Sequence, residues 1–235
     1  MKHGHDEIHS LDACLPHESA IDSLQQAWLR ANVSSGDRLL DLGCGCGRTL
    51  VPLARAGAIC TGLDQESSVL DECRQSLESS RATAELVNAE CIEWLGATDG
   101  TWDVVCCLGN TLCQFWQIDQ AIELLVRIRR RLEPGGFLVI DDIPGDLWPE
   151  LTQGNWQAGL DHEQGRQLVW SADDAVFAIR SSSNIDENDW DIGPDDDPLR
   201  LWTASHLQLV ARIAGYSVPL VPKNSSVRVL RPVGD

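Results

Sequence analysis

A glycine-rich loop near the start of the chain is the clearest chemical feature of the sequence. The apolar run Arg38-Leu39-Leu40-Asp41-Leu42 leads into Gly43-Cys44-Gly45-Cys46-Gly47. Glycine lets a backbone turn sharply and lets a ligand approach the main chain closely. The helix expected next, over residues 48–56, points free N–H groups and its positive dipole end toward an electron-rich ligand. The loop therefore predicts a binding site for such a ligand.

An acidic residue ends the strand expected at residues 58–63. This residue, Asp64, can accept hydrogen bonds from both hydroxyls of a ribose. The loop departs from the dinucleotide pattern G-x-G-x-x-G, because position 48 is Arg and the third glycine comes one residue early. The spacing therefore disfavours a nicotinamide-dependent dehydrogenase.

The motif as a whole resembles a known family. Asp41-x-Gly43-x-Gly45-x-Gly47, followed by Asp64, is similar to the first motif of class I S-adenosylmethionine-dependent methyltransferases. The resemblance implies S-adenosylmethionine as the cofactor, with the Asp41 carboxylate helping to organise the pocket for its methionine end. It also implies cofactor contacts from neighbouring positions, namely Cys44, Gln65, Asn88, Ala89, Glu90, Leu108 and Gly109.

The turn Asn88-Ala89-Glu90 follows the third expected strand and has two interpretations. Ligands of open α/β sheets bind at the carboxyl edge, where this turn lies. In the resembled family the turn holds the adenine, through a side chain or a backbone N–H. Alternatively, the turn only caps the short helix expected at residues 91–95. Both interpretations stay open.

The end of the fourth strand carries the candidate acceptor residue. The run from Leu108 to Leu112 resembles glycine and sarcosine N-methyltransferases and their small-molecule relatives, in which this asparagine faces the substrate. Asn110 offers both donors and an acceptor. The alternative is that Gly109 and Asn110 merely turn the chain. Their place at the ligand edge favours the functional interpretation.

The end of the fifth strand departs from that resemblance. Glycine N-methyltransferases have an arginine here that holds a carboxylate, whereas this chain has Asp141 and Asp142. Two carboxylates favour a neutral or cationic acceptor. Asp142 is therefore a second candidate catalytic residue, acting as a base or hydrogen-bond acceptor. The alternative for this pair is a supporting structural role.

Four tryptophans lie in the segment after the fifth strand. Their rings can attract cations, which suggests an aromatic lid over an amine. Alternatively, they form a small core of their own. His162 is a candidate base because its reference pKa is near neutral, although a lone polar histidine is usually solvated. The tryptophans are Trp148, Trp156, Trp170 and Trp190.

Alternating strands and helices must position these residues. The pattern predicts an α/β fold, a Rossmann-like seven-stranded and mostly parallel methyltransferase sheet with helices on both faces. An antiparallel insert, with strands at 167–171 and 175–180, is expected between the fifth strand and the last helix. The expected sheet strands cover residues 38–42, 58–63, 84–88, 102–108, 137–141, 216–221 and 226–230. The expected helices cover residues 19–31, 48–56, 66–79, 91–95, 118–132 and 203–214.

These elements form one expected methyltransferase domain over residues 1–235, in which residues 144–200 are the inserted lid or substrate segment. The helix at 19–31 is amphipathic and is expected to pack on the sheet edge or at the cofactor mouth. The chain of 235 residues is long enough for a proper core.

Charge and composition exclude several function classes. The net charge of -18 argues against a nucleic-acid partner, because phosphate binding needs clustered cations. The basic cluster at 127–131 suits the C-terminal end of a helix and is interpreted as structural. No apolar run reaches membrane-span length and no signal peptide is evident, so no membrane partner and a cytoplasmic location are expected. The partner is then a small-molecule substrate, and the protein a monomer or homodimer.

The nine cysteines look like small core residues of a reduced cytosolic protein. Cys44-x-Cys46 has no second cysteine pair at zinc-finger spacing, so no metal site is expected there. Histidines at positions 3, 5 and 9 are interpreted as part of a solvated terminus.

The sequence thus predicts an S-adenosylmethionine-dependent methyltransferase acting on a small molecule. Nitrogen is the favoured acceptor atom, with oxygen or carbon as alternatives. Asn110 and Asp142 are expected to orient the acceptor. A hypothesis from another class is a catalytically inactive S-adenosylmethionine-binding protein that acts as a regulatory subunit.

Overall fold

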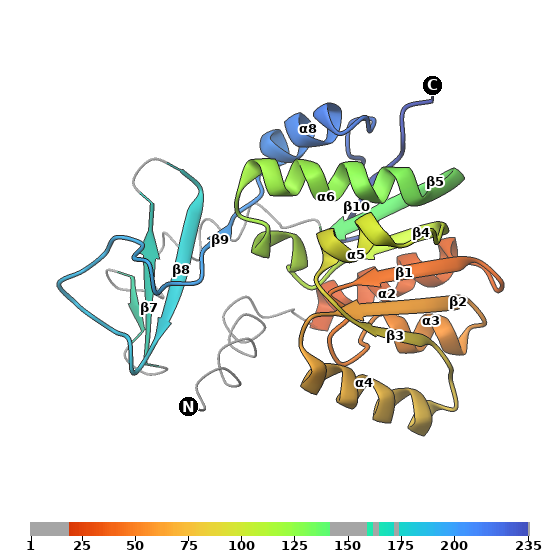
Figure 1. Cartoon of the computed structure of the whole chain (residues 1–235), viewed down its shortest axis with the longest axis horizontal. Coiled ribbons are helices and arrows are strands. Elements are labelled where there is room, and N and C mark those ends of the chain that lie inside the picture. Colours follow the sequence, from red (N-terminus) through yellow and green to blue (C-terminus); the bar gives the residue numbers. More distant parts are fainter. Residues whose placement is uncertain (1–18, 142–158, 162–164, 172–173, 235) are drawn as a thin grey trace.

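The structure, a computed structural model, describes residues 19–141, 159–161, 165–171 and 174–234 (Figure 1). It contains a six-stranded sheet with helices on both faces and a separate four-stranded sheet. The larger sheet has the order β10-β5-β4-β1-β2-β3, with only β10 antiparallel to its neighbour. Its strands are β1 (Arg38–Leu42), β2 (Ile59–Asp64), β3 (Glu85–Asn88), β4 (Trp102–Cys107), β5 (Leu132–Asp141) and β10 (Val227–Leu230).

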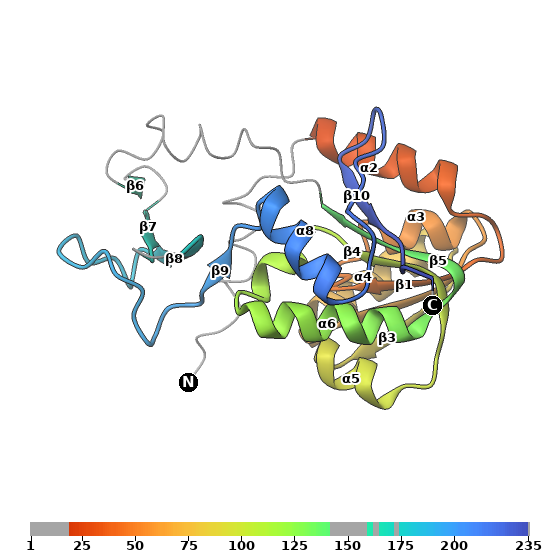
Figure 2. The ribbon, with the colours of Figure 1, turned by 90° about the horizontal axis from the view of Figure 1, so that it is seen from above.

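Two apolar clusters lie on opposite faces of this sheet. One joins α5, α6 and α8 to the sheet, and the other joins α2, α3 and α4 to it (Figure 2). Leu39 belongs to one cluster and Leu40 to the other, as the alternation of a strand requires. The central strands are apolar because both of their faces are buried. The helices are α2 (Ser19–Asn32), α3 (Leu50–Arg55), α4 (Ser67–Ser80), α5 (Cys91–Ala97), α6 (Ile118–Arg131) and α8 (Ala204–Ile213).

The prediction of seven strands is wrong by one among the described residues. The segment expected as a strand at 216–221 makes only two isolated bridges, from Tyr216 to Pro232 and from Leu220 to Val229. Pro219 within the segment has no N–H to give to a ladder, which prevents continuous pairing. The expected strand at 226–230 is present as β10, and it pairs with β5.

Strand β5 also begins earlier than predicted. The sequence predicts a strand that starts at residue 137, yet the strand starts at Leu132, directly after α6. Gly135 has a φ of +87°, which lets the backbone bend inside the strand, and the pairing with β4 shifts register between Trp102 and Val104.

The insert forms the second sheet, with the order β6-β7-β8-β9. Antiparallel strands were predicted at β7 and β8, and both are present. A small core of Leu168, Phe177, Leu199 and Leu201 lies on this sheet. Figure 2 shows the sheet at one end of the molecule, beyond the helices. Its strands are β6 (Leu160–Asp161), β7 (Arg166–Trp170), β8 (Val176–Ser181) and β9 (Leu199–Arg200).

Strand β9 ties the second sheet to the segment that follows β4. This segment contains the short 3-10 helix η1 (Thr111–Gln114). Arg200 donates from Nε to the Trp116 carbonyl oxygen at 2.5 Å, and the Trp202 indole donates to the Leu112 carbonyl at 2.9 Å. The second sheet is therefore anchored near the carboxyl edge of the larger one. Among the described residues, no helix is both long and apolar enough to cross a membrane.

Candidate functional site

The glycine loop lies between β1 and α3 with all three glycines in the left-handed region. A side chain at Gly43 would meet Thr111 Oγ1 at 2.5 Å, and one at Gly47 would meet Cys73 Sγ at 2.7 Å. At Gly45, with a φ of +51°, an added Cβ would meet nothing within 4 Å. Gly43 and Gly47 therefore allow close packing inside the protein, whereas Gly45 leaves the backbone open to a ligand.

Asp64 holds this loop in place. Its Oδ2 accepts a hydrogen bond from the Gly45 N–H at 2.9 Å, and its Oδ1 accepts one from the Glu66 N–H at 3.0 Å. The N–H of Gly43 also donates to the Leu63 carbonyl at 2.8 Å. The loop and the end of β2 are thus joined at the carboxyl edge, and the ribose contact of Asp64 stays a prediction.

Asp41 is a buried carboxylate with spare hydrogen-bonding capacity. It is 2 % exposed, and its Oδ2 has no hydrogen-bond partner among the described residues. Burial raises its pKa to about 7; nearby Arg48 opposes this shift, and the charges of Asp64 and Asp141 add to it. An unpaired buried carboxylate oxygen fits a cationic group such as an ammonium.

Arg48 and helix α2 form a part of the site that the sequence did not reveal. Helix α3 begins at Leu50 rather than at residue 48, so Arg48 remains in the loop. Its Nη1 forms an ion pair with Asp22 and donates to Gln25 Oε1 at 3.2 Å, both on α2. The sequence predicted that this amphipathic helix packs on the sheet edge or at the cofactor mouth. The structure packs it on one face of the sheet, through Leu29, with these contacts to Arg48 of the glycine loop, and its place beside a cofactor stays a prediction.

Asp141 supports the loop after β4 instead of facing a ligand. It is 7 % exposed and accepts hydrogen bonds from the Asn110 N–H at 2.8 Å and from the Gly109 N–H at 3.3 Å. Gln25 Nε2 donates to the same carboxylate at 2.8 Å. The supporting interpretation is therefore the one observed for Asp141. The neighbouring candidate Asp142 lies outside the described residues.

Asn110 itself has a left-handed backbone, with a φ of +62°, and is 8 % exposed. No described residue hydrogen-bonds its side-chain amide, whereas its backbone N–H is fixed by Asp141. The turn interpretation and the functional one are compatible here, because the turn places the amide at the carboxyl edge. Leu108 is buried, and its carbonyl accepts a hydrogen bond from the Thr111 hydroxyl at 2.8 Å.

The turn after β3 mainly organises its own backbone. Asn88 Nδ2 donates to the carbonyls of Asp64 at 3.1 Å and of Gln65 at 2.8 Å. The Ala89 N–H also donates to the Asp64 carbonyl, at 3.1 Å. Glu90 accepts from the Glu93 N–H at 2.7 Å, which confirms its prediction as the cap of α5. The adenine contact of this turn stays a prediction.

Cys44 takes part in the loop through its backbone and through its thiol, which lies 3.8 Å from the Gly45 carbonyl oxygen. Its side chain is 6 % exposed, and its thiol shares a hydrogen bond with that of Cys73 on α4. That hydrogen bond, together with burial, raises the pKa of the Cys44 thiol. The thiol is therefore a core group in the described structure, as the cysteine pattern predicted.

Trp170 and Trp190 are the tryptophans of the insert that the structure describes, and the lid interpretation stays a prediction. Trp170 packs on Phe177 with ring centroids 5.1 Å apart, which supports a core role. Trp190 is 37 % exposed, and its indole donates to the Glu187 carbonyl at 2.9 Å. Trp148, Trp156 and His162 lie outside the described residues.

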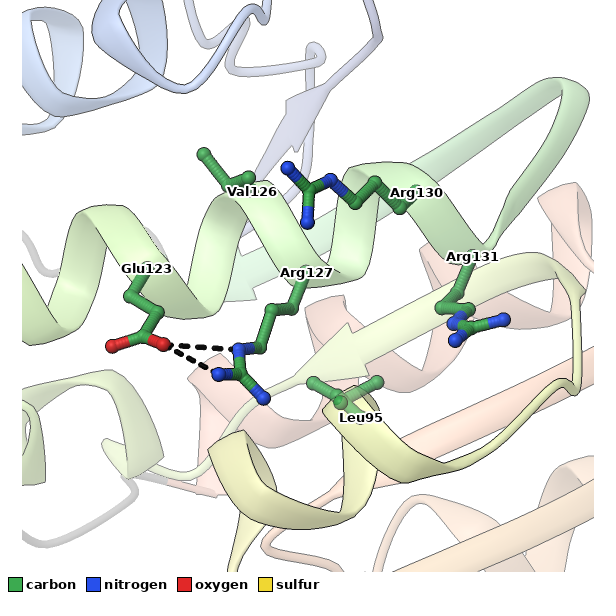
Figure 3. A pocket seen from close by; sticks show the side chains of 7 residues that line it. Leu95, Glu123, Val126, Arg127, Arg130 and Arg131 are labelled. Carbon is green, nitrogen blue, oxygen red and sulfur yellow. Dashed lines mark hydrogen bonds and ion pairs between the residues drawn. The ribbon is translucent and has the colours of Figure 1, made fainter.

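A hollow of about 390 Å³ lies between α5 and α6, away from this site (Figure 3). Arg127 spans it, donating to the Ile92 carbonyl at 2.6 Å and pairing with Glu123 at 2.6 Å. The other arginines of the cluster lie in the last turn of α6, where cations complement the helix dipole. The structural interpretation of this cluster is confirmed for Arg127, which fixes one helix to the other.

Comparisons with known proteins cover the part of the chain that contains the glycine loop. Residues 39–136 match the family model described as a methyltransferase domain. The cypemycin N-terminal methyltransferase of a Streptomyces species is 34% identical over 116 residues, covering 49% of this chain and 46% of that protein. The ubiquinone biosynthesis O-methyltransferase of Aromatoleum aromaticum is 33% identical over 89 residues, covering 37% of this chain and 38% of that protein.

Similarity to solved structures extends over almost the whole chain. The S-adenosylmethionine-bound structure of CalS10, an amino pentose methyltransferase from Micromonospora echinaspora, has a TM-score of 0.61 at 18% identity and covers 98% of each chain. By contrast, the chain spans about half the length of the curated relatives it matches. Residues 39–136, which include the glycine loop, thus match a methyltransferase domain, and the fold of the chain is that of S-adenosylmethionine-dependent methyltransferases of known structure.

Proposed function

We propose that this chain methylates a small-molecule acceptor, with nitrogen as the favoured acceptor atom. The proposal is carried by the open backbone at Gly45, which is hydrogen-bonded to Asp64, together with the unpartnered oxygen of buried Asp41 on the strand that leads into the loop. These residues fit S-adenosylmethionine. Asp41 matches its ammonium, the Gly45 backbone lies open beside it, and Asp64 stands where a ribose would be bound.

The chain contributes mainly by positioning its ligands. When bound, the cofactor supplies a methyl group already activated on a sulfonium sulfur. Holding two reactants in the right geometry is worth on the order of 7 kcal/mol or more in favourable cases. Asn110 would supply that orientation, because its amide oxygen can accept an N–H of the acceptor and turn the nitrogen lone pair toward the methyl group.

Charge supports an amine over a carboxylate acceptor. The chain carries a net charge of -18, which raises the local concentration of cationic molecules around it. Asp141 lies where the resembled glycine N-methyltransferases have a carboxylate-binding arginine. Its carboxylate accepts hydrogen bonds from the loop after β4 and from Gln25. The names of the cypemycin relative and of CalS10 point to amino-group and amino-sugar substrates, while that of the ubiquinone relative points to oxygen. Asp142 remains a candidate base on the strength of the sequence.

The proposal is tested in two steps. Isothermal titration with S-adenosylhomocysteine is expected to show binding, and a lack of binding at millimolar concentration would rule the proposal out. Methyl-labelled S-adenosylmethionine is then incubated with amino sugars, small amines, phenols and carboxylic acids. Label on nitrogen supports the proposed acceptor, label on oxygen alone replaces it, and binding without any transfer supports the regulatory hypothesis.

A further inference from the structure

One buried side chain connects two loops of the site. The first is the glycine loop with Arg48, called the cofactor loop below. The second is the loop after β4 with Gly109 and Asn110, called the acceptor loop below. Gln25 on α2 is 1 % exposed. Its Oε1 accepts a hydrogen bond from Arg48 Nη1 at 3.2 Å, and its Nε2 donates to Asp141 Oδ1 at 2.8 Å. The same Nε2 lies 3.3 Å from the carbonyl oxygen of Ser226, at the start of β10. A single amide thus contacts the glycine loop, the end of β5 and the chain before β10.

The chemistry of these partners allows only one orientation of the amide. Arg48 is a pure donor, and the carboxylate of Asp141 is an acceptor when ionised. Turning the amide over would place its NH₂ against the guanidinium and its oxygen against the carboxylate. A displacement of Arg48 must therefore rotate or translate Gln25, and with it the hydrogen bond to Asp141.

Asp141 passes this constraint to the acceptor loop. Its Oδ2 holds the Asn110 N–H at 2.8 Å, while Oδ1 lies 3.3 Å from the Gly109 N–H. Asn110 has a left-handed backbone, which asparagine adopts more readily than most residues, and the hydrogen bonds to Asp141 hold the turn in this conformation. Arg48 also lies near this loop, because its Nη2 is 3.7 Å from where a Gly109 Cβ would be.

We propose that Gln25 is a positioning residue that couples the cofactor loop to the acceptor loop through Arg48 and Asp141. The inference rests on the proposed function, because it assigns Gly43–Gly47 to the cofactor and Asn110 to the acceptor. Cofactor binding at the glycine loop restricts the movement of the Arg48 side chain, and its hydrogen bond to Gln25 then restricts Gln25. Because Gln25 also bonds to Asp141, the Asp141 carboxylate holds the acceptor loop more firmly. The acceptor loop would thereby reach its working geometry only once the cofactor is in place.

Hydrogen exchange of the full chain, with and without S-adenosylhomocysteine, tests this coupling. In the wild type, the ligand is expected to slow exchange in the peptide covering residues 107–113 by about tenfold, the scale of one added buried hydrogen bond. Gln25→Met keeps the length of the side chain but removes both hydrogen bonds. It is expected to abolish the slowing while the ligand still binds.

The neighbouring Gln26 provides a matched control. It is 7 % exposed, and its Nε2 donates to the Arg48 carbonyl at 3.0 Å, whereas no hydrogen bond joins it to Asp141 among the described residues. Gln26→Met is therefore expected to keep the ligand-dependent slowing. If Gln25→Met fails to fold, Gln25→Glu keeps an acceptor for Arg48 but sets a second carboxylate against Asp141, and it should also lose the slowing.

The outcomes separate this inference from the proposed function. Failure of the wild type to bind S-adenosylhomocysteine would remove both. Binding without any slowing at residues 107–113, or slowing that persists in both Gln25 variants, would overturn the coupling alone. Once an acceptor is identified, Gln25→Met should lower kcat while the KM for the cofactor changes by less than about threefold. A general loss of stability would not lower kcat alone in this way.

Discussion

The backbone N–H of Gly45 donates a hydrogen bond of 2.9 Å to Oδ2 of Asp64, so the glycine loop and the end of β2 form one unit. Because Asp64 Oδ1 also accepts the Glu66 N–H, the carboxylate orders backbone on both sides of the site. A ligand that bonds to Asp64 thus meets a carboxylate whose position is already set.

Replacing Asp64 with alanine should weaken cofactor binding. Loss of a buried hydrogen-bonding group typically costs about 1–3 kcal/mol, and here the loop loses its anchor as well. Titration calorimetry with S-adenosylhomocysteine measures the change. Asp103→Ala is the control, because Asp103 also accepts a backbone N–H, that of Arg38 at 2.8 Å, but lies at the opposite edge of the sheet. Equal affinities for the two variants would place the ribose contact elsewhere.

Alanine at Gly45 and at Gly47 should have opposite consequences. At Gly47 the added Cβ would lie 2.7 Å from Cys73 Sγ and from Val51 Cγ2, so Gly47→Ala should lower the unfolding midpoint strongly. At Gly45 the Cβ enters open space, and the backbone strain is on the order of 1–2 kcal/mol. Gly45→Ala should therefore lose S-adenosylhomocysteine affinity more than stability. Denaturant unfolding and calorimetry on both variants check the contrast, which similar losses of stability would contradict.

Asp41 should make stability depend on pH. Burial raises its pKa from 3.8 to about 7, so the folded protein keeps a proton that the unfolded chain releases in that range. The contribution of Asp41 to the free energy of unfolding is therefore greatest below pH 3.8, its pKa in the unfolded chain. This contribution falls by up to about 1.4 kcal/mol per pH unit as the pH rises toward the folded pKa. Urea unfolding at several pH values should show a flatter profile for Asp41→Asn. Parallel profiles would mean that Asp41 is ionised when buried.

Binding of an ammonium beside Asp41 should also release a proton below neutral pH, because the cation favours the carboxylate. The affinity for S-adenosylmethionine should therefore rise with pH up to about 7 in the wild type, the pKa of Asp41, and lose this dependence in Asp41→Asn. Calorimetry in buffers of different ionisation enthalpy measures the proton directly. Identical proton release by both proteins would assign the titration to another group.

Removing the side chain of Asn110 should lower the turnover rate without lowering the affinity for the cofactor. Asn110→Gly is the better variant, because glycine tolerates the φ of +62° that alanine would strain. A loss of about tenfold or more in kcat is expected for an orienting hydrogen bond. Transfer of labelled methyl to an acceptor, with calorimetry alongside, gives both quantities. A lower affinity for the cofactor with an unchanged kcat would instead assign Asn110 to the cofactor pocket.

The second sheet should unfold separately when Arg180 is replaced. Its guanidinium, 7% exposed, donates to both oxygens of Asp196, from Nε at 2.8 Å and from Nη2 at 2.7 Å, and lowers the pKa of that carboxyl. Arg180→Met leaves the largely covered Asp196 carboxylate without its counter-ion, a loss of about 1–3 kcal/mol. Hydrogen exchange should rise in β7 and β8 while S-adenosylhomocysteine still binds. The double variant with Arg180→Met and Asp196→Leu should restore the protection of β7 and β8 against hydrogen exchange. If it does not, the ion pair is not what stabilises the second sheet.

The parts of this molecule that the sequence predicts are those with a local cause. Strand β4 is an apolar run because both faces of the sheet are covered, and Gly43 precedes a tight turn. The expected strand at 216–221 failed at Pro219, where the apolar pattern and the missing N–H conflict.

The supporting contacts of the site have no such local signature. Gln25 and Asp141 are 116 residues apart in the chain, and nothing near either residue indicates that they meet. Arg48 was assigned to a helix because it follows the glycines, whereas its partners on α2 hold it in the loop. Position at a sheet edge could therefore be predicted from the sequence, but the partner of each polar group could not.

The hydrogen bond from Gln25 to the Ser226 carbonyl joins residues 201 positions apart. During synthesis on the ribosome, the glycine loop and the parallel strands emerge long before Ser226 does. This contact can therefore form only after the whole stretch from Gln25 to Ser226 has been made, whereas the residues of the glycine loop are present much earlier. Because such a long loop must close before the contact forms, we expect it to be a late event in folding.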